Sequence, residues 1–161
     1  MHLTRLRWAA AIALAVVVAG AGVAAVVPRA LGDGDDAAKL KAELKKFQGT
    51  WVDVYAEKAG KKQESVGEHL LKFDGETFSV ADHDHVEEKG TIKLNPSKNP
   101  MEIDLRFRGG NNEEKTVLGI YTWDGEDLKL CWGEPGGGTR PTDFTTTPEG
   151  GFLVVVKRQG P

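Results

Sequence analysis

From residue 50 onward, the chain consists of short runs rich in branched and aromatic residues, separated by Gly, Asp, Asn and Pro. Runs of this kind are typical of β-strands bounded by turns. We expect strands near residues 50–56, 68–73, 77–81, 88–94, 102–107, 116–123, 127–132, 141–145 and 152–157. The sequence shows no alternation of strands with long helical segments, so a parallel α/β fold is not expected.

Two turns are strongly specified by their residues. Asp74-Gly75 and Asp124-Gly125 each lie between two strand-like runs, and these residue types tolerate the positive φ that a tight hairpin requires. The strands that flank them are therefore predicted to be antiparallel. We expect a looser hairpin at residues 109–112 and a Pro-bounded loop at residues 95–100.

The alternation of apolar and charged residues within the strands predicts a sheet with one solvent-exposed face. Ile103, Leu105 and Phe107 alternate with charged residues, as in a strand that is buried on one side only. Residues 117–123 are apolar on both faces, so another element should cover the second face. Eight or nine meandering strands favour closure into a small barrel, because closure removes exposed strand edges. A two-sheet sandwich is the alternative.

A single short amphipathic helix is predicted before the strands. Leu40, Leu44 and Phe47 recur at i, i+4 and i+7 among Lys and Glu over residues 37–47, and this spacing is that of a helix with one apolar face. Gly49 follows as a helix-ending residue. This helix is the available cover for the sheet.

The N-terminus has the order of a secretory leader. Arg5 and Arg7 precede an apolar stretch at residues 8–27, and no acidic residue occurs before Asp33. A retained membrane anchor is the alternative, because about 20 apolar residues suffice to span a bilayer. Either reading predicts export to the periplasm or cell envelope, with membrane contact through the N-terminal segment only.

The predicted organisation is therefore a leader or anchor at residues 1–27, a spacer at 28–36 and one domain at 37–161. Asp35 or Asp36, at the end of the spacer, is placed to cap the helix. The chain has 21 Lys and Arg against 24 Asp and Glu, a net charge of −3, and interspersed charges of this kind argue against a nucleic-acid partner. Cys131 is the only cysteine, which excludes an internal disulfide, and we interpret it as structural.

Five short segments occur in a specific order: Phe-Gln-Gly-Thr-Trp at 47–51, Leu-Gly-Ile-Tyr at 118–121, Asp-Leu-Lys-Leu-Cys at 127–131, Arg-Pro-Thr-Asp-Phe at 140–144 and Val-Val-Val-Lys-Arg at 154–158. The series resembles a family of small exported domains of unknown function that is abundant in planctomycete bacteria, over residues 44–158. No catalytic residues are assigned to that family, so the resemblance implies none here. Gly49 and Trp51 after a short helix also resemble the start of a lipocalin-type barrel.

Two sets of histidines are candidate site residues. His83 and His85 lie in an Asp-His-Asp-His stretch, and imidazole and carboxylate groups suit Zn or another divalent cation. The alternative is an exposed polar loop between strands. His69 alternates with Leu71 and Phe73, so it is predicted to point toward the barrel interior, where an imidazole can act as acid, base or ligand contact; the alternative is a structural His at a strand end.

Arg140 follows a glycine-rich loop at residues 133–138 and precedes Pro141. A guanidinium held at a barrel mouth would bind a carboxylate or phosphate. We expect the alternative, a structural arginine paired with carboxylates and carbonyls of neighbouring strands. The loop lacks the Lys and the following helix that a phosphate-binding P-loop needs.

Four aromatic residues are candidates to line an apolar cavity, or else they fill the core: Trp51, Tyr121, Trp123 and Trp132. A barrel of about eight strands holds either side chains or one small ligand. The sequence contains no Gly-x-Ser-x-Gly and no His-Glu-x-x-His motif, and no cofactor is expected. We therefore expect a non-catalytic envelope domain that binds a small apolar or anionic ligand or an envelope protein. The alternatives are a metal-dependent or hydrolytic enzyme that uses His69 or the pair His83 and His85, and a purely structural component.

Overall fold

The structure is a computed structural model, and it describes residues 33–64, 67, 69–82, 85–108 and 113–160. The predicted leader or anchor at residues 1–27 lies outside these residues. Among the described residues, no helix is long and apolar enough to cross a bilayer.

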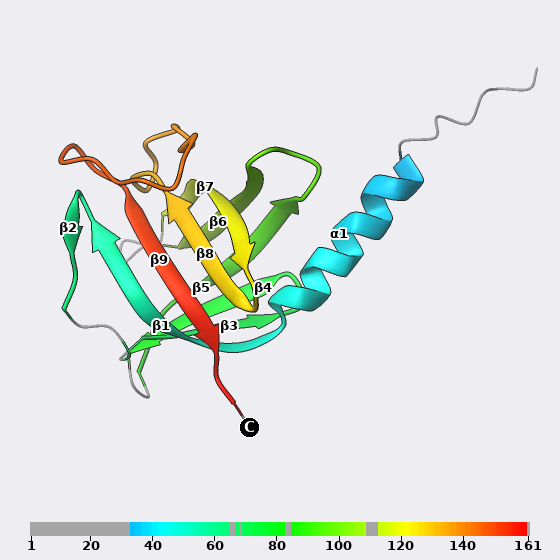
Figure 1. Cartoon of the computed structure of the whole chain (residues 1–161), viewed down its shortest axis with the longest axis horizontal. Helices are drawn as coiled ribbons and strands as arrows, with labels where there is room; N and C mark the ends of the chain where they lie inside the picture. The colour runs from blue at the N-terminus through cyan, green and yellow to red at the C-terminus, as the bar shows by residue number, and fades with distance from the viewer. Residues whose placement is uncertain (1–32, 65–66, 68, 83–84, 109–112, 161) are drawn as a thin grey trace, which may run out of the picture. The chain divides into compact units, whose positions relative to one another are not determined.

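One helix and nine strands make up the described part of the chain (Figure 1). The elements are α1 (Asp33–Phe47), β1 (Gly49–Lys58), β2 (Lys61–Lys62), β3 (His69–Asp74), β4 (Thr77–Asp82), β5 (His85–Asn95), β6 (Met101–Arg108), β7 (Glu114–Asp124), β8 (Asp127–Trp132) and β9 (Phe152–Arg158).

The strands form a closed antiparallel barrel. Strand β1 pairs with β3, each strand from β3 to β8 pairs with the next, and β9 returns to pair with β1. Eight strands therefore close the barrel, and the two-residue strand β2 pairs with the end of β1. The prediction of an antiparallel meander closed into a barrel is confirmed, and the sandwich alternative is wrong.

Both Asp-Gly hairpins form, but of each Asp-Gly pair only the glycine is one of the two central residues of the turn. Asp74 pairs with Thr77 and Asp124 pairs with Asp127, so the aspartates are the last residues of their strands. Gly75 has φ 60° and Gly125 has φ 62°. Glycine at the first central position with positive φ is the requirement of a type II′ turn, whose twist matches that of the flanking strands.

The strand predicted at residues 141–145 is wrong. These residues lie in the long connection between β8 and β9, which contains one isolated bridge, Thr147 to Gly150. Pro141 has no N–H to give to a ladder. The Asp143 carboxylate accepts a hydrogen bond from the backbone N–H of Thr145 at 3.1 Å, a local side-chain bond that competes with strand pairing.

Helix α1 begins at Asp33, inside the predicted spacer. Asp35 and Asp36 therefore lie within the first turns of the helix and do not cap it, although acidic residues there still favour the positive end of the helix dipole. The Asp36 carboxylate accepts a hydrogen bond from the Ser97 hydroxyl at 2.6 Å. This bond attaches α1 to the loop between β5 and β6.

The C-terminal end of α1 closes one end of the barrel. Phe47 is 0% exposed, and its ring meets the rings of Phe73, Tyr121 and Trp123 edge to face, with centroids 5.1, 5.1 and 5.4 Å away. Leu40 and Leu44 are partly buried against the same core. The helix thus closes this end of the barrel and packs against the core inside it.

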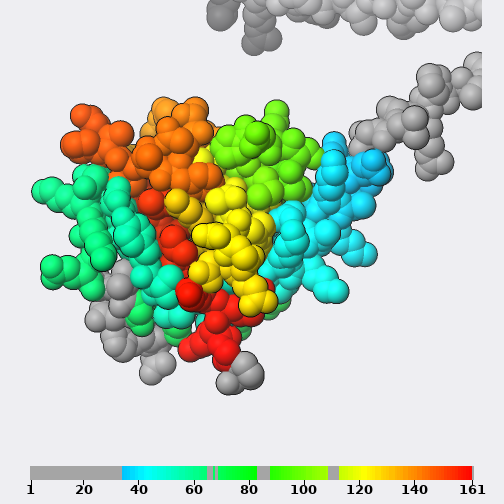
Figure 2. All heavy atoms as spheres, in the orientation of Figure 1, coloured from blue at the N-terminus to red at the C-terminus, as the bar shows by residue number. Residues whose placement is uncertain are grey.

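The outer face of β7 has a different cover from the one predicted. We expected the helix to cover it, but Ile120 on that face packs with Cys131 and Leu153, beneath Phe144 of the β8–β9 connection. In Figure 2 this connection (orange) lies against β7 and β8 (yellow), whereas α1 (cyan) lies on the other side of them. A long irregular segment therefore buries the apolar outer face.

Candidate functional site

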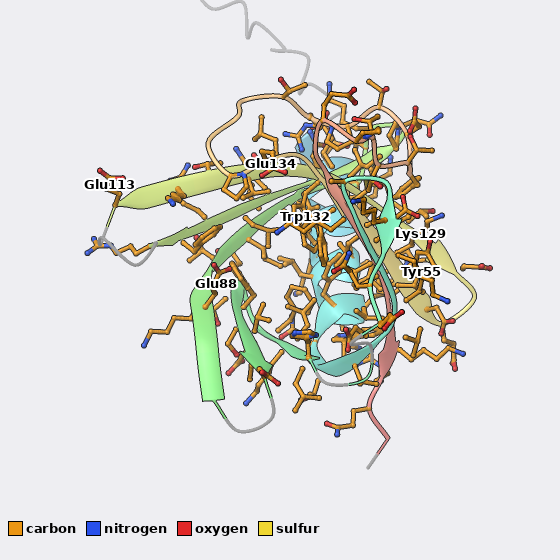
Figure 3. All side chains as sticks on the ribbon, turned by 90° about the vertical axis from the view of Figure 1, so that its left-hand side faces the viewer. Tyr55, Glu88, Glu113, Lys129, Trp132 and Glu134 are labelled. Atoms are coloured by element: carbon orange, nitrogen blue, oxygen red, sulfur yellow. The ribbon has the colours of Figure 1, made fainter. Side chains whose placement is uncertain are left out.

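The barrel contains a cavity of ≈ 380 Å³ at the end opposite α1, with walls from β1, β3, β4, β5, β8 and β9. Figure 3 looks toward this end, with α1 behind the barrel and Trp132 near the centre of the view. The wall is mostly apolar and carries a few polar groups. The lining residues are Asp53, Ala56, Lys58, Gln63, His69, Leu71, Val80, Glu88, Trp132, Phe152, Val154 and Val156.

A smaller compartment of ≈ 130 Å³ lies next to the first. The two share four lining residues, namely Leu71, Val80, Glu88 and Trp132. The other lining residues of the smaller compartment are Phe73, Phe78, Leu105, Phe107, Val117, Leu130 and Pro135. Glu88 is thus the single charged residue among those that line it, and the interior of the site is apolar.

Trp132 forms a wall common to both compartments. It is the last residue of β8 and pairs across the sheet with Phe152 of β9, and the two rings stack with centroids 4.9 Å apart and planes at 28°. Trp132 is partly buried. Cross-strand aromatic pairs hold one another in place, so the cavity has one rigid aromatic side.

A buried carboxylate orients His69 at the cavity. Asp53 is 5% exposed and lies where a bulge shifts the register of β1 against β9. One of its oxygens accepts from the backbone N–H groups of Gly67 at 2.8 Å and His69 at 3.1 Å, and the other lies 3.1 Å from His69 Nδ1. These donors compensate the burial of the charge. With Nδ1 occupied by Asp53, Nε2 is the nitrogen that His69 offers to a ligand.

An open cleft adjoins the cavity where β5 and β6 diverge. Among the described residues, β5 pairs with β6 from Gly90 to Asn95. A Cβ atom on Gly90 would lie 2.1 Å from the carbonyl oxygen of Arg106. Glycine therefore permits the two strand backbones to approach closely at Gly90, next to the point where they part. The cleft has a volume of ≈ 630 Å³, and Glu88 and Phe107 line both the cleft and the smaller compartment.

Of the predicted ligand-binding residues, His69 and Trp132 line the cavity, whereas Trp51, Tyr121, Trp123 and Arg140 do not. Trp51 and Tyr121 are both 0% exposed and belong to the core at the closed end. The Trp51 indole N–H donates to the Phe47 carbonyl at 2.7 Å, and the guanidinium of Arg158 lies 4.3 Å from its ring centroid.

Arg140 has the partners of a structural arginine. Its Nη1 donates to the carbonyl oxygens of Gly119 and Ile103, and its Nη2 lies 2.6 Å from an Asp104 carboxylate oxygen. Its Nε lies 3.6 Å from the Glu102 carboxylate. Arg140 therefore joins β6 and β7 and is not among the residues that line the cavity. This is the partner list that we expected of the structural alternative.

We expect Arg140→Met to lower the free energy of unfolding by about 1–2 kcal/mol, because it leaves two backbone carbonyls and a carboxylate without their donor. The figure is modest because the Arg140 side chain is 23% exposed, so water screens and partly replaces the lost bonds. Urea denaturation measures the change. Arg108→Met, at an exposed position at the end of β6, is the control, and an equal loss in both variants would refute the structural role.

The histidine pair predicted to bind metal lies outside the residues whose side chains the structure describes. His83 lies outside the described residues, and the structure describes only the backbone of His85, which pairs with Asp82. Among the described residues, no group of three or more His, Cys, Asp or Glu side chains is arranged to hold a metal ion. The metal site at His83 and His85 stays a prediction.

Cys131 is enclosed on the outer face of the barrel. Its thiol is 0% exposed and donates to the Thr145 carbonyl at 3.6 Å. Burial, with a smaller contribution from the charge of Asp143, raises the pKa of the Cys131 thiol to about 11. A protonated and enclosed thiol is a poor nucleophile.

We therefore expect Cys131 in the native protein to react with Ellman's reagent only when the domain unfolds. The raised pKa of the Cys131 thiol also determines how the stability of the domain changes with pH. Because the unfolded thiol ionises near ~8.5 and the folded one near 11, the unfolded state holds fewer protons between these values, and stability falls as the pH rises through this window. Reaction in native buffer as fast as in denaturant would contradict the enclosure.

No protein-family model, curated protein or solved structure matches the chain. The resemblances to the planctomycete domain family and to lipocalin-type barrels therefore stay predictions. Sequence reasoning identified His69 and Trp132 but missed Asp53 and Glu88. The alternation of Asp53 with Trp51 could have placed Asp53 inside the barrel, whereas the position of Glu88 depends on where β5 leaves β6.

Proposed function

We propose that this domain binds a small, predominantly apolar molecule inside its barrel and carries out no catalysis. The observation behind this proposal is the cavity of ≈ 380 Å³ with its apolar wall, its stacked Trp132 and Phe152, and its few polar groups. Small-molecule sites in proteins usually have volumes of about 300–1,000 Å³ and this mixture of lining groups.

The architecture supports the same proposal. Closed up-and-down barrels of about eight strands, lipocalins among them, are wide enough to hold one small ligand. We infer a lipocalin-like arrangement from the meandering strand order and from Gly49 and Trp51 at the start of β1. Helix α1 closes one end, so a ligand would enter from the other.

Two measurements test ligand binding. Native mass spectrometry of the protein isolated from its own cell envelope should reveal a retained small molecule. In addition, the fluorescent apolar probe N-phenyl-naphthylamine should bind the purified protein, and Val80→Trp should abolish binding because Val80 lines both compartments. Val54→Trp, at a position that is 41% exposed, is the matched control. A protein that neither retains a molecule nor takes up the probe would instead be a structural component.

The contact of Asp53 with His69 favours a second candidate, a hydrolase in which His69 acts as general base. None of the described residues that line the cavity is Ser, Thr or Cys, and we take water as the group that His69 would activate in this candidate reaction. Hydrolysis of an apolar ester that is lost in His69→Gln, with unchanged probe binding, would support this candidate over simple binding.

We also propose that the domain is exported to the periplasm or cell envelope. The support is the sequence alone, with Arg5 and Arg7 ahead of the apolar residues 8–27. Cell fractionation followed by N-terminal sequencing of the mature protein tests export and distinguishes a cleaved leader from a retained anchor.

A further inference from the structure

Glu88 is the residue at which the two compartments and the open cleft meet. It lines both compartments and the cleft between β5 and β6. It is also the only charged residue among the described residues that line the smaller compartment, which we call the inner compartment from here on. Figure 3 shows Glu88 on β5, at the side of the barrel from which β6 and β7 diverge. A molecule that extends across both compartments therefore passes this carboxylate.

The Glu88 carboxylate differs from Asp53 in its partners. Asp53 is buried, and its oxygens are taken by two backbone N–H groups and by His69. The Glu88 side chain is exposed and makes no hydrogen bond or ion pair with any other described residue. Among the described lining residues, Glu88 is thus the acidic group that is free to pair with a ligand.

The other charged groups do not reverse this preference. Lys58 is exposed and lines the larger compartment only. Lys89, Arg106 and Arg108 line the outer cleft and not the cavity, and Arg106 lies 3.6 Å from the carboxylate of Glu114. An acidic ligand at Glu88 would meet a like charge, which disfavours binding.

Two further features favour a ligand that donates hydrogen bonds. Because Nδ1 of His69 faces Asp53, a neutral His69 presents Nε2 as an acceptor. Trp132, shared by both compartments, offers an aromatic ring of the kind that attracts cations. Acceptors and an aromatic face together match a positively charged donor.

We propose that the ligand is a small apolar amine, whose protonated nitrogen pairs with Glu88 while its apolar body lies against Trp132 and in the inner compartment. This inference rests on the proposed function, ligand binding inside the barrel, and it adds the chemical class of the ligand. It also replaces the anionic ligand that Arg140 would have served, because the donors of Arg140 are already taken.

Three probes with the same apolar body test the inference: naphthylmethylamine, naphthylmethanol and naphthoic acid, titrated calorimetrically into the full-length protein at neutral pH. We expect the amine to bind about tenfold more tightly than the alcohol, the scale of one hydrogen bond to a charged group, and the acid to bind more weakly than both. Glu88→Gln should reduce the affinity for the amine to that for the alcohol and leave the affinity for the alcohol unchanged.

Glu76→Gln is the matched control, because it removes the same charge from an exposed hairpin position that lines neither compartment. Unchanged alcohol binding also shows that the Glu88 variant is folded. If the alcohol binds but the amine has no advantage, or keeps its advantage in Glu88→Gln, the amine inference is overturned and cavity binding stands. If none of the three probes binds the wild-type protein, both proposals are overturned.

Discussion

Replacing Phe47 by alanine should lower the free energy of unfolding by about 3–5 kcal/mol, the usual cost of deleting a fully buried aromatic side chain. Phe47 is 0% exposed and is the last residue of α1. The substitution removes three edge-to-face ring contacts and leaves a void beneath Trp123. The neighbouring rings belong to β3 and β7, whose backbones are fixed by the barrel, so they cannot collapse into that void. Chemical denaturation monitored by tryptophan fluorescence measures the loss.

Leu44→Ala provides the graded comparison for Phe47→Ala. Leu44 packs against the same core from the preceding turn of α1 but is only half-buried, so we expect a loss of about 1–2 kcal/mol. Equal and small losses in the two variants would show that the barrel is stable without its helix.

The sequence was sufficient where local chemistry decides the structure. Both Asp-Gly hairpins form because a two-residue turn of this type needs a glycine with positive φ, and an Asp-Gly pair between two strand-like runs is recognisable in the sequence. The alternation of Ile103 and Phe107 with charged residues identified the inner face of β6 correctly, since both are buried. Closure followed from strand number and from the cost of exposed edges.

The sequence was insufficient to predict those parts of the structure that depend on contacts between distant segments of the chain. Residues 141–145 were predicted to form a strand, yet the Asp143 carboxylate bonds locally to the backbone N–H of Thr145, and Phe144 packs against the outer face of β7. Trp51 and Tyr121 are as aromatic as Trp132, but the closed end of the barrel contains the first two and the cavity contains the third. Which end α1 would close depends on packing that no single strand encodes.

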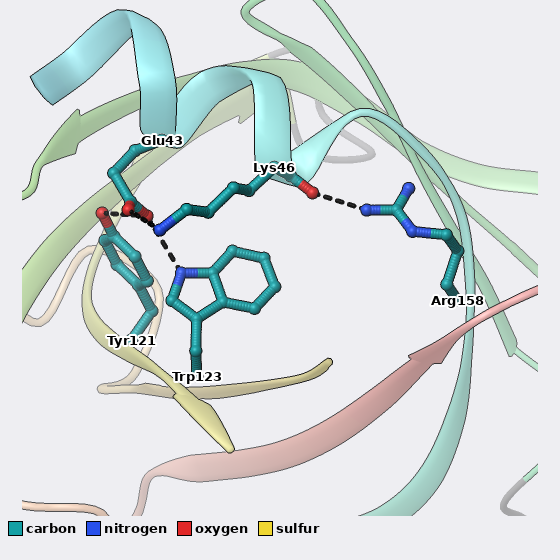
Figure 4. Close-up of polar contacts among 5 residues, drawn as sticks. All are labelled: Glu43, Lys46, Tyr121, Trp123 and Arg158. Atoms are coloured by element: carbon teal, nitrogen blue, oxygen red, sulfur yellow. Dashed lines mark hydrogen bonds and ion pairs between the residues drawn. The ribbon is translucent and has the colours of Figure 1, made fainter. Parts of the chain in front are cut away.

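The closed end of the barrel depends on a buried carboxylate as well as on apolar contacts. Glu43 on α1 is 8% exposed. One of its oxygens accepts from the Trp123 indole N–H at 2.9 Å and from the Tyr121 hydroxyl at 3.4 Å, while the other lies 2.6 Å from the Lys46 ammonium (Figure 4). Burial, together with the charge of Glu43, raises the pKa of the Tyr121 phenol, so that hydroxyl stays a donor.

We expect Glu43→Ala to lower the free energy of unfolding by about 2–3 kcal/mol, because it leaves the Tyr121 hydroxyl and the Trp123 N–H without their acceptor. Lys46 adds little to this figure, since its side chain is 55% exposed and returns to water. Glu43→Gln keeps an acceptor oxygen for Trp123 and should cost less than about 1 kcal/mol. Denaturant titration of both variants separates the two contributions. If glutamine is as destabilising as alanine, the negative charge of Glu43, and not an acceptor oxygen alone, is what stabilises the contact between α1 and β7.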